Sequence, residues 1–193
     1  MWKYKFHVPE TKQVRLLVYT DCANEADDQY AVAHVLMTQK FDVVGIIAAH
    51  FDMNTRREGA PYAPGTTAQA SYDEILTVLD KMGVSGQYPI ALGSGVPLED
   101  EKTPILSDGA KMIIEEAMKD DPLPLYIGCQ GSITDLASAI LAKPEICDRM
   151  TAIWIGGGLS KRWIRVQPHA GYQRRKRIIF FQNASMADPD ESI

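Results

Sequence analysis

The stretch VRLLVYTDCANEADDQYAVAHVL, residues 14–36, decides the fold of this chain. Val14–Tyr19 form an apolar run rich in β-forming residues, and the run ends abruptly at Asp21. A short polar loop follows, and a helical pattern then begins with Asp27 and Asp28. The stretch therefore predicts a strand, a loop and a helix N-terminus, with three carboxylates converging on one point.

The three carboxylates indicate a cation site. Ligands of open α/β sheets bind at the carboxyl ends of the strands, and a helix N-terminus favours negative charge. One Asp would be an ordinary helix cap, but Asp21, Asp27 and Asp28, with Glu25 beside them, would raise one another's pKa unless a cation lies among them. Ca²⁺ or Mg²⁺ is the simplest candidate, because both take oxygen ligands. The alternative is a capped helix with a solvated acidic loop.

The composition fits one soluble domain. The 193 residues can bury a sizeable core, and 46% hydrophobic with 23% charged residues is ordinary for a globular protein. The sequence contains no apolar run of membrane-spanning length and no typical secretory signal. We therefore expect no membrane partner. Cys22, Cys129 and Cys147 are widely spaced without metal-type pairing, which predicts reduced thiols and a cytoplasmic location.

Beyond residue 36, short β-rich runs alternate with longer helical patterns. This alternation is typical of βαβ units and predicts an α/β fold with a doubly wound, mostly parallel open sheet of Rossmann-like type. A right-handed crossover would place the second strand beside the first. The expected strands are 14–19, 41–49, 88–92, 123–129 and 151–155, and the expected helices are 27–39, 66–82, 108–118 and one capped by Ser132.

The helical patterns also predict which residues face inward. In the first two helices the expected buried residues are Ala31, Val32, Val35, Leu36, Ile75, Leu76 and Leu79. Gly83 is expected to end the second helix. The loop 50–64 follows the carboxyl end of the second strand, so His50, Asp52 and Asn54 are candidates for the wall of a binding pocket. A plain surface loop explains the same residues equally well.

Three motifs resemble the inosine-uridine-preferring nucleoside hydrolases. TDCANEADD stands at residues 20–28, where that family has D-T-D-P-G-x-D-D. GSITDLA at 131–137 resembles its G-P-L-T-N-L-A, and AIWIGGG at 152–158 resembles its strand ending in M-G-G. The family's leading Asp is Tyr19 here, its Pro-Gly is missing, and two extra residues lengthen the acidic loop. The resemblance covers about residues 13–158 and implies a divergent member, so substrate identity does not carry over.

The resemblance implies roles for individual residues. Asp21 would bind Ca²⁺ and act as the catalytic general base toward water, and Asp28 would be a second metal ligand. Asp27 would bind a ribose hydroxyl, and the backbone carbonyl of Gln130 would complete part of the metal shell. The implied activity is Ca²⁺-dependent hydrolysis of the N-glycosidic bond of a ribonucleoside or another ribose-containing small molecule. The alternative is a catalytically dead ribose- or metal-binding module.

The tail differs from the rest of the chain. From Lys161 onward there are seven Lys or Arg and three Asp or Glu, a net charge of +4 that leaves −9 for residues 1–160. We therefore divide the chain into a nucleoside hydrolase-like part, 1–160, and a basic tail, 161–193, outside the family fold. A basic arm for nucleic acid is one interpretation. The acidic body opposes it, because it would repel the same partner.

A frameshift is the second interpretation of the tail. Codons permitted for residues 162–177, read one base later, give GGYEFNLMQDINAAN, which contains the E-F-N that the resembling family has at this point. On this hypothesis the polypeptide is a truncated enzyme with little or no turnover. The missing C-terminal elements would leave an exposed sheet edge, and we therefore expect homo-oligomers or aggregation.

Overall fold

The computed structural model describes residues 4–51 and 61–155, together with the backbone of residues 178–180. The described residues form one six-stranded sheet in the order β3-β2-β1-β4-β5-β6, and every pairing is parallel. The predicted doubly wound α/β fold is therefore confirmed. The elements are β1 (Val14–Thr20), α1 (Ala26–Leu36), β2 (Phe41–Ala48), α2 (Thr67–Lys81), β3 (Ile90–Leu92), α3 (Asp108–Met118), β4 (Leu125–Cys129), α4 (Thr134–Ala142), β5 (Met150–Trp154) and β6 (Ile178–Phe180), with short 3-10 helices at Glu10–Lys12 and Pro144–Asp148.

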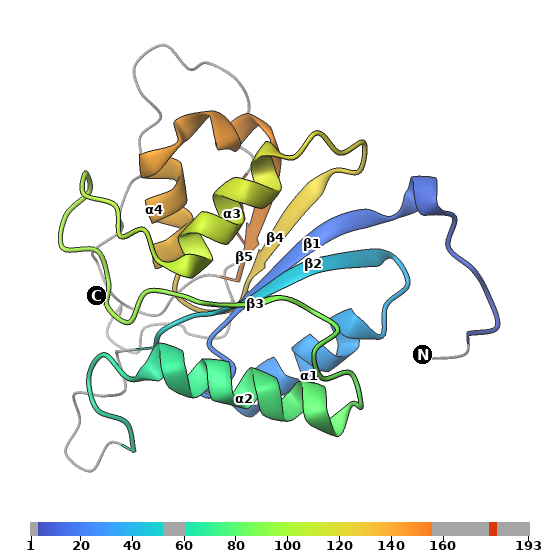
Figure 1. Ribbon diagram of the computed structural model, residues 1–193, viewed down its shortest axis with the longest axis horizontal. Coiled ribbons are helices and arrows are strands. Elements are labelled where there is room, and N and C mark those ends of the chain that lie inside the picture. Colours follow the sequence, from blue (N-terminus) through green and yellow to red (C-terminus); the bar gives the residue numbers. More distant parts are fainter. Residues whose placement is uncertain (1–3, 52–60, 156–177, 181–193) are drawn as a thin grey trace, which may run out of the picture.

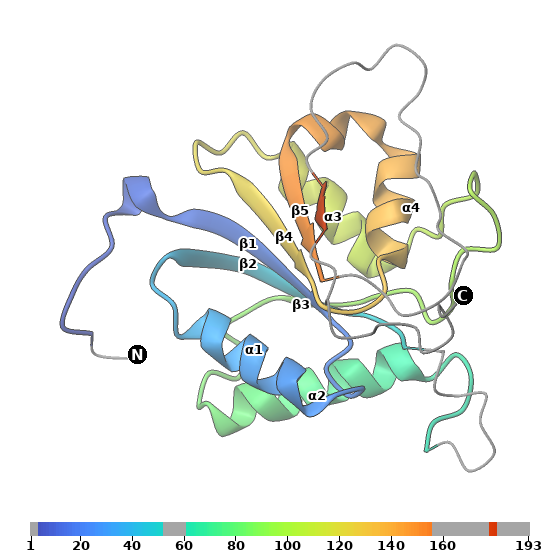
Figure 2. The same cartoon turned by 180° about the vertical axis from the view of Figure 1, so that it is seen from behind.

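Helices cover both faces of the sheet. Figures 1 and 2 show α1 and α2 on one face and α3 and α4 on the other. Side chains of β1 alternate between these layers: Leu16 and Val18 pack toward the core of α1 and α2, whereas Leu17 and Tyr19 pack in the core of α3 and α4. Because both faces of β1 are buried, its sequence reads as a nearly continuous apolar run.

The helices lie where the patterns predicted them, with three corrections. The first helix, expected over 27–39, ends at Leu36. Gly83 follows α2 with φ of +70°, a left-handed conformation that glycine adopts without strain. Leu76 was expected inside but is 45% exposed, because it lies outside the stripe of α2 formed by Ile75 and Leu79. Ser132 does not cap α4, whose N-cap is Ile133, without a side-chain hydrogen bond.

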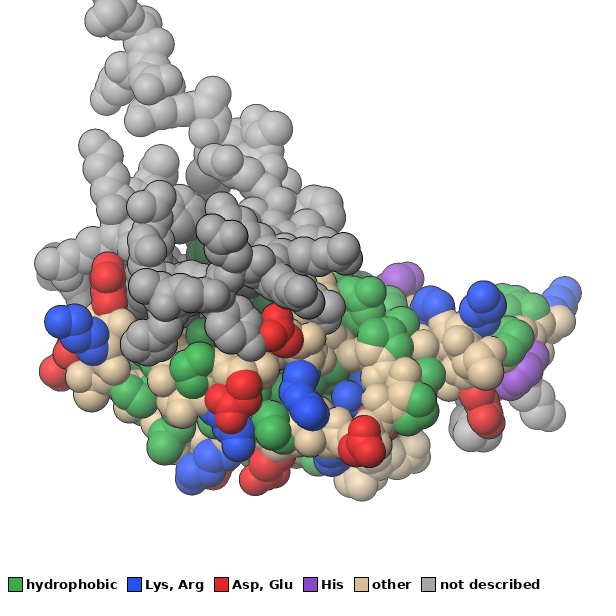
Figure 3. Space-filling view, turned by 90° about the horizontal axis from the view of Figure 1, so that it is seen from above, with side chains coloured by type: hydrophobic (Ala, Val, Ile, Leu, Met, Phe, Trp, Pro, Cys, Tyr) green, Lys and Arg blue, Asp and Glu red, His purple; other side chains and the backbone are tan. Residues whose placement is uncertain are grey.

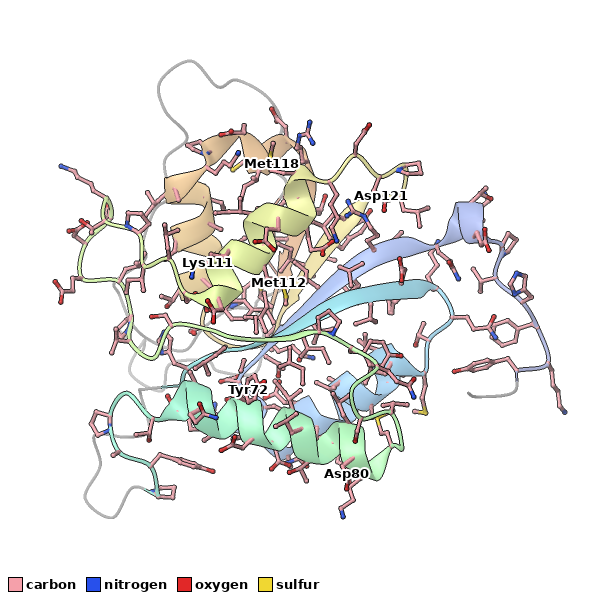
Figure 4. All side chains as sticks on the ribbon, viewed as in Figure 1. Tyr72, Asp80, Lys111, Met112, Met118 and Asp121 are labelled. Carbon is pink, nitrogen blue, oxygen red and sulfur yellow. The ribbon has the colours of Figure 1, made fainter. Side chains whose placement is uncertain are left out.

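A buried ion pair lies at the amino end of the sheet. Arg15, at the start of β1, is 3% exposed, and its Nη1 lies 3.4 Å from Oε2 of Glu116 on α3. The same nitrogen donates to the Glu116 carbonyl oxygen at 3.0 Å, and Nε donates to the Leu123 carbonyl oxygen at 3.3 Å. Nε also lies 3.6 Å from the carboxylate of Asp121, which follows α3 (Figure 4). These contacts fasten α3 to β1 at the end opposite Asp21.

The described surface carries charges of both signs. In the space-filling view of Figure 3, acidic and basic side chains lie interspersed over the coloured part of the face. Among the described residues, no helix combines the length and the apolarity that a membrane crossing requires.

The tail enters the described structure through β6 alone. Its three residues extend the sheet by pairing in parallel with β5. Residues 156–177 and 181–193 lie outside the described part of the chain. The division at residue 160 and the frameshift therefore stay predictions.

Candidate functional site

Asp21 lies directly after β1, at the carboxyl end of the central strand. The side chain is buried, and its Oδ2 accepts a hydrogen bond of 3.0 Å from Nδ2 of Asn24. The backbone of Asn24 donates to the Asp21 carbonyl oxygen at 2.7 Å, which closes the loop into a turn. Burial raises the pKa of Asp21 to about 6, although the hydrogen bonds act in the opposite direction. Asp21 therefore exchanges protons near neutral pH.

Asp28 lies in the first turn of α1 and is also buried. Its Oδ1 accepts a hydrogen bond of 3.2 Å from Oγ1 of Thr20, the last residue of β1. Burial and then the negative charge of Asp21 raise the pKa of Asp28 to about 7. The same environment raises the pKa of Cys22 to about 12, through burial first and then Asp28, Glu74 and Asp21. Burial is thus the largest cause of all three shifts and the neighbouring carboxylates add to it, so a cation at this point would stabilise the ionised carboxylates.

Two carboxylates, rather than three, form the buried part of the site. Asp27 and Glu25 are exposed, although their charges still raise the pKa values of Asp21 and Asp28. Within the described residues, no three His, Cys, Asp or Glu side chains gather as a metal cluster. The expected convergence of three carboxylates is therefore wrong for Asp27, which the helix places toward solvent. A cation here would need further oxygens from the backbone, amides or water.

The turn between β4 and α4, residues 130–133, supplies such oxygens. Its Gly131 packs against Asp21 so closely that a Cβ there would lie 2.4 Å from Asp21 Oδ1. The backbone N–H of Gln130 donates to the Tyr19 carbonyl oxygen at 2.8 Å, and Nε1 of Trp154 donates to the Gly131 carbonyl oxygen at 2.9 Å. The turn is thus fixed against β1 and β5, directly beside Asp21.

Two oxygens of this turn are buried without a partner. Oε1 of Gln130 and Oγ of Ser132 make no hydrogen bond to any described residue. Buried polar atoms are almost always paired in native proteins, so two unpaired oxygens in the turn that packs on Asp21 point to a ligand. Carboxylate, amide and backbone oxygens are the donors that Ca²⁺ prefers. The residues present therefore fit Ca²⁺, with Asp21, Asp28 and Gln130 as the candidate ligands.

His50 lies just beyond β2 and is buried. Its Nε2 is 2.7 Å from Oγ1 of Thr134, the first residue of α4. This contact brings His50 to the same sheet edge as the turn at residues 130–133. Its expected contact with a substrate stays a prediction. Asp52 and Asn54, the other two candidates from this loop, lie outside the described residues.

Sequence reasoning missed two residues that orient the carboxylates and one that fixes the turn beside them. Asn24 donates a hydrogen bond to the Asp21 carboxylate, and Thr20 donates one to the Asp28 carboxylate. The carbonyl oxygen of Tyr19 accepts a hydrogen bond from the turn. Asn three residues after an Asp is a turn signal that could have indicated the first of these. A Tyr within an aliphatic strand signals a buried hydroxyl that needs a partner. For Thr20 the sequence contains no comparable signal.

A groove of about 480 Å³ lies elsewhere, along the edge strand β3. Tyr72 of α2 lies on one side of β3, and Lys111 and Met112 of α3 lie on the other (Figure 4). None of its lining residues is a candidate ligand, base or substrate contact, so the groove is separate from the Asp21 and Asp28 site.

Gly131→Ala should weaken the site, whereas Gly128→Ala should not. The new methyl group at residue 131 would lie 2.4 to 2.9 Å from atoms of Asp21, so that carboxylate must move. We expect a loss of about 1–3 kcal/mol in stability, typical of overpacking, together with weaker Ca²⁺ binding. At residue 128 the nearest atom is Leu16 Cδ1 at 3.8 Å, an ordinary contact. Urea unfolding and Ca²⁺ titration of both variants provide the check, and equal behaviour would contradict the close packing of Gly131 on Asp21.

The parallel sheet, the helices on both its faces and its polar carboxyl edge define a doubly wound α/β protein. The chain belongs to the family described as "Cellulose-binding Sde182, nucleoside hydrolase-like domain", whose family model matches residues 15–152. The match includes the turn at residues 130–133 and both buried carboxylates. Comparison with the curated proteins finds no match.

Two solved structures show similarity to this chain. An inosine-guanosine nucleoside hydrolase has a TM-score of 0.54 at 16% identity, over 75% of this chain and 48% of that one. A nucleoside hydrolase-related hypothetical protein from Saccharophagus degradans, associated with carbohydrate metabolism, has a TM-score of 0.49 at 17% identity, over 74% of this chain and 38% of that one. The chain therefore spans about half, or less, of the length of these proteins.

Proposed function

We propose that this chain contains the Ca²⁺ and water-activating half of an N-ribosyl hydrolase. The observation that carries the proposal is the pair of buried carboxylates, Asp21 and Asp28, with pKa values of about 6 and 7 beside a turn with unpaired oxygens. Strongly shifted pKa values at the carboxyl ends of central strands are typical of functional sites. Membership of a nucleoside hydrolase-like family supports the same reaction class.

Asp21, Asp28 and the backbone carbonyl of Gln130 would hold the cation. When bound there, Ca²⁺ would supply positive charge that makes a neighbouring water more acidic. We assign Asp21 as the proton acceptor, because it is a buried carboxylate at the carboxyl end of β1 and the family resemblance implies this role for it. Asn24 donates to Asp21 Oδ2 and so holds the carboxylate in one orientation.

Hydrolysis requires a balanced exchange at the anomeric carbon. The water oxygen forms the new bond to that carbon, and its proton goes to Asp21. The C–N bond breaks, and its electron pair leaves with the base, which takes up a proton from solvent water. We assign Asp27, which is exposed in the first turn of α1, to a ribose hydroxyl. His50 is the candidate for a second sugar contact.

Carbohydrate binding without hydrolysis is the second candidate. The description of the matched family contains the term cellulose-binding, which favours this function over a nucleic-acid module. A ribose- or metal-binding module without turnover belongs to the same alternative.

All three cysteines are free thiols, in keeping with the cytoplasmic location that we propose.

Nucleoside binding with a parallel assay of base release separates these functions. The full 193-residue chain would be titrated with inosine, uridine, ribose and cellotetraose by calorimetry, with Ca²⁺ or with a chelator. We expect Ca²⁺-dependent nucleoside binding that Asp28→Asn abolishes. Release of free base that Asp21→Asn abolishes would establish the hydrolase. Binding without release would establish a binding module, and failure to bind any nucleoside or ribose would overturn the ribosyl site.

Ca²⁺ affinity should rise with pH between about 5 and 8. Asp21 and Asp28 have pKa values of about 6 and 7, so protons compete with the cation for both carboxylates below pH 6. In the Ca²⁺-free chain these values exceed the ordinary 3.8, so the folded state binds protons more tightly than the unfolded state. Their contribution to stability is therefore largest near pH 4 and is lost as pH rises through 7. Calorimetric Ca²⁺ titrations and urea unfolding across this range would measure both trends, and a pH-independent affinity would contradict them.

A further inference from the structure

We propose that Asp135, acting through Tyr19, is a positioning residue for the Asp21 and Asp28 site. The inference rests on the proposed function and extends it to a buried polar group that the catalytic scheme leaves unused. Asp135 lies in the first turn of α4 and is completely buried. Asp135 is surrounded by the end of β1, the loop after β3 and the start of α3.

Three neutral donors surround the carboxylate of Asp135. Oη of Tyr19 donates to Oδ2 at 2.6 Å, and the backbone N–H of Ser94 donates to Oδ1 at 2.9 Å. Oγ of Ser107, the N-cap of α3, donates to the same Oδ1. Burying a carboxylate costs several kcal/mol unless hydrogen bonds replace its water, and three donors supply that replacement.

The surrounding backbone is fitted to this carboxylate. A Cβ at Gly93 would lie 2.4 Å from Oδ2 of Asp135, and one at Gly109 would lie 3.3 Å from its Cγ. Both glycines therefore let the backbone approach where a side chain would collide. Gly93 follows β3 and Gly109 begins α3, so two further segments close around Asp135. Such close packing leaves Asp135 little freedom to move.

Tyr19 connects this buried group to both ends of the turn at residues 130–133. Its carbonyl oxygen accepts from the N–H of Gln130 at 2.8 Å, where the turn begins. Its hydroxyl oxygen accepts from the N–H of Asp135 at 3.1 Å, just after the turn ends. Asp21 lies two residues after Tyr19, and Gly131 of the turn packs on it. Asp135 thus fixes Tyr19, and Tyr19 fixes the turn against Asp21.

The residues at these two positions differ from those in the family motifs quoted above. The resemblance described above places an Asp of the family at Tyr19 and an Asn at Asp135. Here the acidic residue stands on α4 and the donor stands on β1, and the two are in contact. Two of the departures from the family motifs therefore meet in a single hydrogen bond.

Two readouts on the full chain test the positioning role. Tyr19→Phe removes only the hydroxyl, and Asp135→Asn keeps the shape but removes the charge. The matched control is Glu116→Gln, which alters another buried carboxylate at the opposite end of the sheet. Hydrogen exchange would follow the amides of Gln130 and Asp135 without Ca²⁺, and calorimetry would measure Ca²⁺ affinity.

We expect faster exchange at both amides and about 10- to 100-fold weaker Ca²⁺ binding in Tyr19→Phe and Asp135→Asn, as for other residues that orient metal ligands. Glu116→Gln should destabilise the chain. It should leave the exchange rates of the Gln130 and Asp135 amides, and the Ca²⁺ affinity, within about twofold of wild type. Unchanged exchange and affinity in Tyr19→Phe would overturn the positioning role. If the wild-type chain binds no Ca²⁺ while exchange still accelerates in Tyr19→Phe, Asp135 positions the turn and only the proposed metal function fails.

Discussion

Ca²⁺ should raise the melting temperature of this chain, and Asp28→Asn should abolish the increase. A ligand that binds only the folded state at 100 times its Kd stabilises that state by about 2.7 kcal/mol. For a domain of this size the increase corresponds to roughly 5–10 °C. Asp28 is the buried carboxylate in the first turn of α1, and its replacement removes one of the two buried carboxylates that would bind the cation.

The control for this experiment is Asp80→Asn. Asp80 lies in the last turn of α2 with its side chain 72% exposed, so the same chemical change occurs far from the site (Figure 4). This variant should keep the full Ca²⁺-induced increase, and a chelator should reverse it. An increase that survives Asp28→Asn would place the ion elsewhere, and the lack of any increase in the wild-type chain would remove the cation from the proposal.

Arg15→Met should destabilise the chain by about 3–5 kcal/mol, the usual range when one partner of a buried ion pair is removed. The substitution leaves the buried carboxylate of Glu116 without its closest buried cation. Lys119, whose Nζ lies 2.5 Å from Glu116 Oε1, remains as a half-exposed partner and should keep the loss near the lower limit. Urea unfolding monitored by circular dichroism would measure the change.

Two further variants separate burial from charge in this result. Lys111→Met removes an exposed pair with Asp108, in which the side chains are 55% and 74% exposed, and should cost less than about 1 kcal/mol. The double variant Arg15→Met with Glu116→Leu should recover much of the loss, because it leaves no buried charge. An equal loss in Arg15→Met and Lys111→Met would show that burial does not control the energy of this pair.

The layered fold follows from patterns that are local in sequence. Leu16 and Val18 alternate with Leu17 and Tyr19, and this alternation matches the two cores that flank β1. Gly83 marks the end of α2 because few other residues tolerate its positive φ. Leu76 was misplaced because a helical stripe has a broad edge, and only the packing of α2 against the sheet decides which border residue is covered.

The candidate site is only partly local. Asp21 and Asp28 lie within one strand-loop-helix stretch, so the sequence alone brings both to the carboxyl end of β1. Their raised pKa values are not local, because burial is the largest cause for each and depends on what the rest of the chain packs around them. Asp27, one residue from Asp28, remains exposed because adjacent residues on a helix point about 100° apart.

By itself, the sequence determined the order of strands and helices along the chain up to β5. It also determined that the sheet is parallel and that an acidic loop lies at its carboxyl edge. These features depend on hydrophobic periodicity and turn residues, which act over a few positions. Only the tertiary structure decided the contacts that hold the site: Tyr19 with Asp135 across 116 positions, and His50 with Thr134 across 84. Such pairs form because parallel strands place their carboxyl ends at one edge, where loops distant in sequence must share hydrogen bonds.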